Sequence, residues 1–474
     1  MRAQAVRGAV ALWAGVALTA CGDAAPGERP NVVLIVVDTL RADALGAYGS
    51  ETGDTPVLDG FAKEAVVFER ASTPRAKTNP AVASLLTGTY PPEHGVRDLG
   101  RPLPARLPTL AEAFRDAGWR TAAIVGNFVL TRERSGFDRG FESWTETLPD
   151  SAGGEGGVPE RRAPSLVDGA LEQLDAFGDA PFFLYLHAMD PHGPYEPPLV
   201  HRVVSGVAEP LEPPHPPVRW QTPTVAERNV PAEARLADGR IDTAAVREAY
   251  RGEVRFVDAE LGRLFAELDR RGLTDDTIVV VTADHGESLG EHAYWFEHGL
   301  HAYEATCHVP LMLRVPARPS ERRDDPASLV DVAPTLAAQV GLEQRFGDER
   351  TEFRGRDLFA SVATRSFSEK AEGADLARAL QIDAVRDARW KLIRRFALDD
   401  VGRRRLLAEE LFDLEHDVQE LVDLIAVPGT APLAELRAAL DAWRAFDDRF
   451  DDAPERAADE DELARLRAMG YLGR

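Results

Sequence analysis

Two carboxylates, one imidazole and one hydroxyl occupy positions in the sequence from which they could bind a cation. Asp38 directly follows a run of apolar β-branched residues, and Asp284 and His285 follow a second such run. A carboxylate at a strand end that faces a cleft is a natural ligand for a hard cation, and an adjacent imidazole can share that ion. Thr78 is the first residue of a stretch typical of a helix, and the positive field at a helix N-terminus stabilises an anion. A nearby cation would also favour the alkoxide form of the Thr78 hydroxyl. Together they predict metal-assisted nucleophilic attack, although each residue alone could be an ordinary turn or capping residue.

Histidines gather in two short stretches, residues 186–195 and 290–299. Five of the eleven histidines fall in or beside them: His187, His192, His292, His298 and His301. A random scatter would rarely concentrate imidazoles in this way, although any single one could be an ordinary surface histidine. Because imidazole acts as a metal ligand and as a general acid or base near neutral pH, the clustering indicates functional segments.

Strands that alternate with helices must position these side chains. Apolar runs typical of buried strands cover residues 31–37, 121–125, 181–187, 277–282 and 309–315. Helical patterns lie between them or follow them, at residues 78–88, 108–117, 246–271 and 329–340. This alternation predicts a doubly wound, mainly parallel α/β sheet flanked by helices. Functional residues of such sheets collect at the carboxyl ends of strands, which is where Asp38, His187 and Asp284 stand.

The remaining segments define the expected domain organisation. Residues 149–165 and 205–235 are rich in Gly, Pro and charge, and we expect surface loops there. Short strands at 384–396 and 409–414 and a helix near 431–446 predict a smaller C-terminal α+β subdomain, followed by an acidic stretch. The expected division is a signal peptide at 1–20, a tether at 21–29, a catalytic domain at 30–375 and the C-terminal subdomain with its tail at 376–474.

The N-terminus has the pattern of a bacterial secretion signal. Arg2 and Arg7 precede an apolar run of about a dozen residues, too short for a membrane span. The segment Leu18-Thr19-Ala20-Cys21 resembles a lipobox, which implies cleavage before Cys21 and a lipid on that cysteine. The alternative is an ordinary secretory signal with an incidental cysteine. We therefore expect a cell-envelope protein that is lipid-anchored at the outer membrane, on the periplasmic or surface side, or else a secreted protein.

Composition excludes several classes of protein. The chain has 474 residues, 44% of them hydrophobic, which is ordinary for a folded protein. Its formal net charge of −24 repels nucleic-acid backbones, so we expect no nucleic-acid partner. Two cysteines are too few for a disulfide scaffold or a cysteine-based zinc module. No later segment reaches the ~20 apolar residues of a membrane span, so only the N-terminal lipid would contact a membrane.

The order of the motifs resembles that of the sulfatase family of the alkaline phosphatase superfamily over nearly the whole mature chain. The first motifs that carry the resemblance are RPNVVLIVVDTLRADALGAYG, NPAVASLLTGTYPPEHGV, GWRTAAIVGNFVL and GFDRGFESW. The later ones are VVTADHGESLGEHAYWFEHG, HVPLMLRVP, SLVDVAPTLAAQVG, WKLI and ELFDLEHDVQEL. Their colinear order is specific, and it implies the family's fold and its ester-hydrolysing activity.

Several positions depart from the family pattern. Typical members carry a Cys or Ser that is oxidised to formylglycine within C/S-x-P-S-R, whereas Thr78 and Val82 occupy the nucleophile and arginine positions. A threonine cannot become formylglycine. The other departures are Thr39 for a second aspartate, Asn127 and Val129 for the Lys and His of G-K-x-H-L, and His298 near a second lysine. The chain is thereby similar to the superfamily's threonine-nucleophile branch, which includes phosphodiesterases and phosphotransferases.

The resemblance implies roles for individual residues. The implied ligands of one divalent cation (calcium, magnesium, manganese or zinc) are Asp38, Thr78, Asp284 and His285. The implied catalytic residues are Thr78, His192 and His298, the histidines binding the ester oxygens or protonating the leaving group. The implied substrate-binding residues are Asn127 and His187. A second cation could bind at Asp190, His192 and His298.

The expected function is hydrolysis of an anionic sulfate or phosphate ester of a small molecule, glycan or lipid, with a covalent intermediate on Thr78. A sulfated formylglycine hydrate can expel sulfate by elimination, which regenerates the aldehyde. A threonine sulfate cannot do this, so its hydrolysis would require water to attack sulfur. A phosphothreonine is hydrolysed by in-line attack at phosphorus, with a metal offsetting charge, which favours P–O cleavage. Two alternatives are a phosphotransferase that uses Thr78 and an inactive protein that binds an anionic glycan.

Overall fold

The computed structural model describes residues 29–152, 158–202, 224–346, 354–370, 380–398, 403–429 and 432–447. The expected signal peptide, Cys21 and the acidic stretch after residue 447 lie outside these ranges. Within the part of the chain that is described, no helix is both long enough and apolar enough to cross a membrane.

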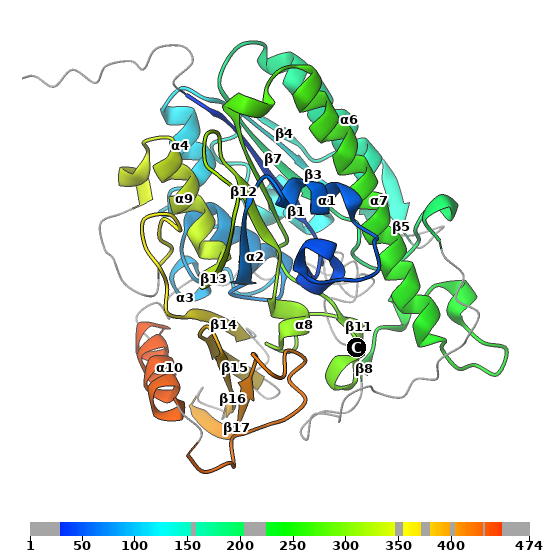
Figure 1. Ribbon diagram of the computed structural model, residues 1–474, viewed down its shortest axis with the longest axis vertical. Helices are drawn as coiled ribbons and strands as arrows, with labels where there is room; N and C mark the ends of the chain where they lie inside the picture. Colours follow the sequence, from blue (N-terminus) through cyan, green and yellow to red (C-terminus); the bar gives the residue numbers. More distant parts are fainter. Residues whose placement is uncertain are drawn as a thin grey trace, which may run out of the picture.

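An eight-stranded sheet forms the centre of the fold (Figure 1). Its strands are β1 (Asn31–Val37), β2 (Val66–Ser72), β3 (Arg120–Val125), β4 (Ser143–Thr145), β7 (Phe182–Ala188), β9 (Thr277–Thr282), β12 (Leu311–Arg314) and β13 (Glu321–Ser328). They lie in the order β13-β2-β12-β9-β1-β7-β3-β4. Neighbours run parallel except at β12, which is antiparallel to both β2 and β9. The predicted doubly wound, mainly parallel α/β sheet is therefore confirmed.

Helices cover both faces of this sheet. The helices of this part of the chain are α1 (Pro56–Ala62), α2 (Thr78–Thr87), α3 (Pro91–His94), α4 (Leu110–Asp116), α5 (Arg132–Ser135), α6 (Ala163–Phe177), α7 (Thr243–Arg270), α8 (Glu304–Cys307) and α9 (Val332–Gln339). On one face, α6 packs on β3 and β7 and against α7, which also carries α1. On the other face, Phe114 of α4 stacks on Phe183 of β7 at 4.7 Å, and α4 packs with α2 and α9.

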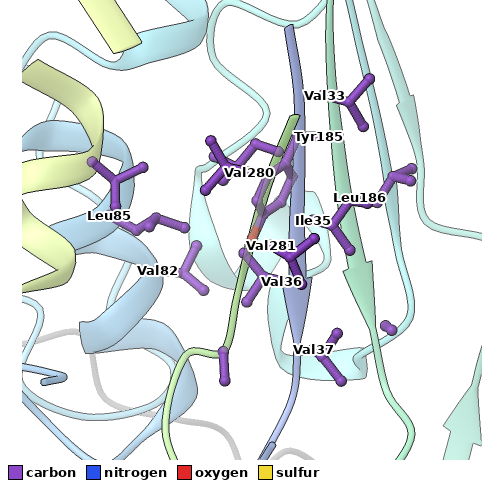
Figure 2. Packing of buried hydrophobic residues seen from close by; sticks show 14 of the residues in the cluster. Val33, Ile35, Val36, Val37, Val82, Leu85, Tyr185, Leu186, Val280 and Val281 are labelled. Carbon is purple, nitrogen blue, oxygen red and sulfur yellow. The ribbon is translucent and has the colours of Figure 1, made fainter. Parts of the chain in front are cut away.

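Strand β1 is buried along its whole length because helices cover both of its sides. All seven residues of its NVVLIVV sequence are buried. Figure 2 shows Val82 and Leu85 of α2 on the side of the sheet that carries Tyr185 and Val280. Full burial of such aliphatic side chains stabilises the fold by roughly 1.5–3 kcal/mol each. The core thus fixes β1 between β7 and β9 and sets α2 beside their carboxyl ends.

The sequence did not predict several strands. β2 reads VVFERAS and β13 reads ERRDDPAS, and β13 is an edge strand whose first residues are largely exposed, so neither has a buried-strand pattern. The expected loops also contain short strands. β5 (Asp150–Ala152) pairs with β6 (Val158–Glu160), and β8 (Thr224–Val225) joins β10 (Ser288–Leu289) and β11 (Tyr294–Glu297) in a small sheet.

A four-stranded antiparallel sheet with one helix forms the smaller C-terminal unit, as predicted. It contains β14 (Ser366–Lys370), β15 (Leu380–Arg386), β16 (Trp390–Leu398), β17 (Arg404–Asp413) and α10 (Leu433–Asp447). Its first strand precedes residue 376, where we expected the unit to begin. The expected single strand at 384–396 is two strands, because Asp387 accepts hydrogen bonds from the N–H groups of Arg389 and Trp390 and forms a tight turn.

Candidate active site

Strand register brings the predicted ligands to one edge and one face of the main sheet. β1 pairs with β7 and β9 so that Val36 lies beside both His187 and Thr282. Asp38 and Asp284 each follow two residues later, so the alternation of side chains directs them toward the same face as His187. This is the face that α2 covers. The predicted position at the carboxyl ends of the strands is therefore confirmed.

Asp38 and Asp284 are completely buried, and each keeps one carboxylate oxygen without a hydrogen-bond partner among the described residues. Asp38 Oδ2 accepts a hydrogen bond from Asn127 Nδ2 at 2.7 Å. Asp284 Oδ1 accepts from the backbone N–H groups of His285 at 2.8 Å and Thr39 at 3.3 Å. The remaining oxygens, Asp38 Oδ1 and Asp284 Oδ2, lie 3.8 and 3.4 Å from His285 Nε2. Two carboxylate oxygens and an imidazole nitrogen thus converge in a buried position.

The two carboxylates differ in their affinity for a proton. Burial, followed by the nearby negative charge of Asp284, raises the pKa of Asp38 well above its ordinary value. Burial acts in the same direction on Asp284, but the imidazoles of His285 and His187 outweigh it and lower its pKa. A cation placed between the two carboxylates would favour the ionised form of both.

Thr78 joins these groups from helix α2. It is the first residue of that helix and is completely buried, and its Oγ1 lies 3.4 Å from His285 Nε2. The capping position belongs to Lys77, whose ammonium pairs with Asp98. The hydroxyl of Thr78 is therefore directed at the carboxylate and imidazole group. The helix ends at Gly88, which has a left-handed φ of 68°, as the sequence predicted.

His192 and His298 lie next to His285. The ring centroids of His285 and His298 are 4.3 Å apart, and those of His192 and His298 are 5.2 Å apart. Nδ1 of His192 lies 2.7 Å from the carbonyl oxygen of Gly193, and Nδ1 of His298 lies 3.2 Å from Glu287 Oε1. Burial lowers the pKa of both imidazoles well below the ordinary value. The structure therefore places both predicted catalytic histidines at the site.

Asn127 and His187, which we expected to contact substrate, both lie against the carboxylates. Asn127 donates its hydrogen bond to Asp38, and His187 Nε2 lies 3.8 Å from Asp284 Oδ2. Asp38, His187 and Asp284 offer one ligand atom each, all within 4.8 Å of one another. Sequence reasoning grouped these three residues at strand ends, but it did not identify His187 as part of the carboxylate cluster.

A second cation at Asp190, His192 and His298, which the sequence left possible, would have to compete for the carboxylate of Asp190. Asp190 Oδ1 accepts a hydrogen bond from Arg162 Nε at 2.9 Å, and Oδ2 accepts from the N–H of Ala163 at 2.8 Å, at the start of α6. Both oxygens are thereby directed at the first turn of α6. The histidines of residues 290–299 have different neighbours. His298 lies beside His285, whereas the ring of His292 stacks on that of Tyr303, with 3.6 Å between the centroids.

Sequence reasoning missed Glu287 and Tyr195. Glu287 is completely buried, contacts His298, and accepts a hydrogen bond from the hydroxyl of Tyr195 at 3.0 Å. The available signal was the segment Asp284-His285-Gly286-Glu287, whose last residue shares a short turn with two predicted ligands.

Comparison with known proteins gives relatives along most of the chain. The family model for Sulfatase matches residues 30–342, more than half of the sequence. The choline-sulfatase of Rhizobium meliloti (strain 1021) is 27% identical over 447 residues, covering 84% of this chain and 83% of that protein. The multifunctional alkaline phosphatase superfamily protein PehA of Trinickia caryophylli is 26% identical over 499 residues, covering 85% and 93%.

Solved structures have the same fold. A 2-O GAG sulfatase superposes with a TM-score of 0.70 at 22% identity, covering 93% of this chain and 96% of that one. The phosphonate monoester hydrolase from Silicibacter pomeroyi superposes with a TM-score of 0.68 at 24% identity, covering 90% and 96%. Together with the arrangement of Asp38, Thr78, Asp284 and His285, these matches lead to one conclusion. The chain belongs to the sulfatase family.

Proposed function

We propose that this protein hydrolyses an anionic ester through Thr78, with a divalent cation held by Asp38, Thr78, Asp284 and His285. The observation that carries the proposal is the convergence of three oxygen atoms on His285 Nε2. Thr78 Oγ1 lies 3.4 Å from it, and the unpartnered oxygens of Asp38 and Asp284 lie 3.8 and 3.4 Å from it. Membership of the sulfatase family supports ester hydrolysis as the reaction.

The residues at this position fit a divalent cation. Asp38 Oδ1 and Asp284 Oδ2 are buried and unpartnered, which would be costly for ionised carboxylates without a compensating positive charge. Two carboxylates, a hydroxyl and an imidazole offer the mixed oxygen and nitrogen donors that such ions accept. When bound, the cation would lower the pKa of the Thr78 hydroxyl and offset negative charge on the transferred group.

The protein groups divide the reaction into two displacements. In the first, Thr78 Oγ1, which has released its proton to solvent, attacks the phosphorus or sulfur of the ester as an alkoxide, and the bond to the leaving oxygen breaks. His192 or His298, which the negative charge of the bound ester favours in its protonated form, donates a proton to that oxygen, so the product leaves as an alcohol. In the second, water attacks the same atom of the threonine ester and gives a proton to the imidazole that acted as the acid, and Thr78 leaves as the alkoxide that began the cycle. The burial of the site limits competing attack by other solvent molecules.

We further propose that phosphate esters are better substrates than sulfate esters. Thr78 cannot supply the carbonyl that lets a formylglycine hydrate expel sulfate by elimination, so release requires water to attack the esterified atom. In-line attack on a phosphoryl group is well suited to a site that positions the nucleophile and offsets charge. Both a choline-sulfatase and a phosphonate monoester hydrolase are similar to this chain. The fold is therefore compatible with hydrolysis at sulfur and at phosphorus.

A matched panel of phosphate and sulfate esters with the same leaving groups tests the proposal. Turnover is measured for the wild type, Thr78→Ala and Thr78→Ser with each of several divalent cations. Thr78→Ala should lose several orders of magnitude in kcat, because only positioning and charge would remain, whereas Thr78→Ser should keep part of the activity. Strong turnover in Thr78→Ala would overturn the assignment of the nucleophile, and faster sulfate than phosphate turnover would overturn the preference.

A further inference from the structure

His187 is a buried imidazole with an unusual lack of partners. It is the sixth residue of β7 and has no exposed surface. Neither of its ring nitrogens has a hydrogen-bond partner among the described residues. Buried histidines that serve only for packing normally satisfy at least one nitrogen, because an unsatisfied buried polar atom destabilises the fold. His94 is such a case, since its Nε2 lies 2.9 Å from Ser84 Oγ and its Nδ1 accepts from the N–H of Val96.

The surroundings of His187 identify the kind of partner that it lacks. Its Nε2 lies 3.8 Å from Asp284 Oδ2, which itself has no hydrogen-bond partner among the described residues. Ligand atoms from Asp38, His187 and Asp284 all lie within 4.8 Å of one another. An imidazole nitrogen and two carboxylate oxygens gathered in this way suit an ion that all three could bind.

We infer that His187 is a further ligand of the cation whose other protein ligands are given under the proposed function, on which this inference rests. The donor set would then contain two imidazoles, from His187 and His285, besides the two carboxylates and the Thr78 hydroxyl. Calcium, magnesium and manganese prefer oxygen donors, whereas imidazole suits zinc. The protein therefore selects zinc over these three cations.

A contact between His187 and substrate would have a different consequence. A residue that only binds substrate can change KM and kcat, but it does not change which cation the free protein selects. Cation binding measured without substrate therefore separates the two roles.

The experiment uses the whole protein after its bound metals have been removed with a chelator. Affinities for Zn²⁺, Mn²⁺, Ca²⁺ and Mg²⁺ are measured by competition with a metal indicator for the wild type, His187→Gln and His416→Gln. The last variant is the matched control, because His416 belongs to the mostly exposed group Asp413, Glu415 and His416, the other possible cation site among the described residues. We expect His187→Gln to lose at least about tenfold in Zn²⁺ affinity, with a much smaller change for Mn²⁺, Ca²⁺ and Mg²⁺. We expect His416→Gln to bind as the wild type does.

A second measurement needs no variant. In Zn²⁺-loaded wild type labelled with ¹⁵N-histidine, the ring nitrogens of His187 and His285 should both show the shifts of metal-bound imidazole. A free imidazole signal for His187, or an unchanged ratio of Zn²⁺ to Ca²⁺ affinity in His187→Gln, would overturn the inference alone. A wild type that binds no cation, or an Asp284→Asn variant that binds cations equally well, would instead overturn the proposed function.

Discussion

Glu287 and His298 form a buried pair in which Glu287 Oε1 lies 3.2 Å from Nδ1 of the imidazole. The other carboxylate oxygen, Oε2, accepts a hydrogen bond from Tyr195 at 3.0 Å. Glu287 follows His285 by two residues, so one short turn carries two proposed cation ligands and the group that orients a proposed proton donor. His298 is thereby held beside His285, with a ring separation of 4.3 Å.

Replacing this carboxylate should impair proton donation more than substrate binding. We expect Glu287→Gln to reduce kcat by roughly 10- to 100-fold with little change in KM, since the loss is a part of the 10²–10⁴ that acid–base catalysis contributes. The loss should be larger for alkyl esters than for nitrophenyl esters, because a good leaving group needs less protonation. A series of leaving groups measures this, with Tyr195→Phe as a control that keeps the Glu287–His298 contact. Equal losses across the series would show that Glu287 does not act through proton donation.

A buried ion cluster joins α8 to the C-terminal sheet. Lys391 Nζ lies 2.9 Å from Glu304 Oε1 and 3.0 Å from Glu420 Oε1, and all three side chains are almost completely buried. We expect Lys391→Met to destabilise the protein by about 3–5 kcal/mol, because buried Glu420 loses its ammonium partner and buried Glu304 keeps only Arg386, at 3.2 Å.

An exposed ion pair in the neighbouring turn provides the control for the Lys391 variant. The side chain of Arg389 is 45% exposed and pairs with Asp413 at 2.6 Å. We expect Arg389→Met to cost no more than about 1 kcal/mol, since solvent screens such pairs. Thermal unfolding of both variants measures the difference, and similar melting temperatures for the two would contradict the importance of the buried cluster.

Asp331 should give a pH-dependent contribution to stability. Burial raises the pKa of this carboxyl to about 6, although the Arg356 guanidinium and the backbone N–H groups of Ser328 and Arg356 act in the opposite direction. The folded state thus binds this proton more tightly than the unfolded chain does. The contribution of the group is most favourable below its unfolded pKa, and about 3 kcal/mol of it is lost as the pH rises through the folded pKa.

The variant Asp331→Asn tests this sign. Asparagine does not titrate, so the free energy of unfolding of the variant should fall less than that of the wild type between about pH 4.5 and about pH 7.5. Chemical denaturation at both values measures it. The absolute stability of the variant is a separate matter, because the two oxygens of Asp331 accept hydrogen bonds from the N–H groups of Ser328 and Arg356. Equal pH dependence in the two proteins would show that Asp331 has no raised pKa.

The N-terminal segment should direct lipid attachment to Cys21. We expect the wild type, expressed in a bacterial host, to sediment with membranes, and Cys21→Ser to be released or to stay unprocessed. Mass spectrometry of the mature N-terminus checks this directly, since it should find a lipid-modified residue 21. A mature chain that begins elsewhere and carries no lipid would exclude the anchor.

The sequence by itself determined the main strands, the edge of the sheet and the principal candidate ligands. The run at residues 31–37 is apolar on both faces, so it had to lie inside a covered parallel sheet, and the same holds for residues 277–282. Strand ends then placed Asp38 and Asp284 at one edge. Pro80 in the first turn and Gly88 after the last residue indicated the beginning and the end of the helix that carries Thr78. These features follow from local patterns. Residues adjacent in the sequence show whether a strand is buried on both faces and where a helix begins and ends.

Only the tertiary structure decided which of the candidate side chains meet. The order β9-β1-β7-β3 sets His187 beside the carboxylates and Asn127 against Asp38, and no local pattern encodes which strands are neighbours. The same strands bring both carboxylate oxygens of Asp190 to Arg162 and the start of α6. The edge strand β13 escaped detection because one exposed side frees its residues from an apolar pattern. The residue types determine what each side chain can do, whereas strand order and helix packing determine which of them act together.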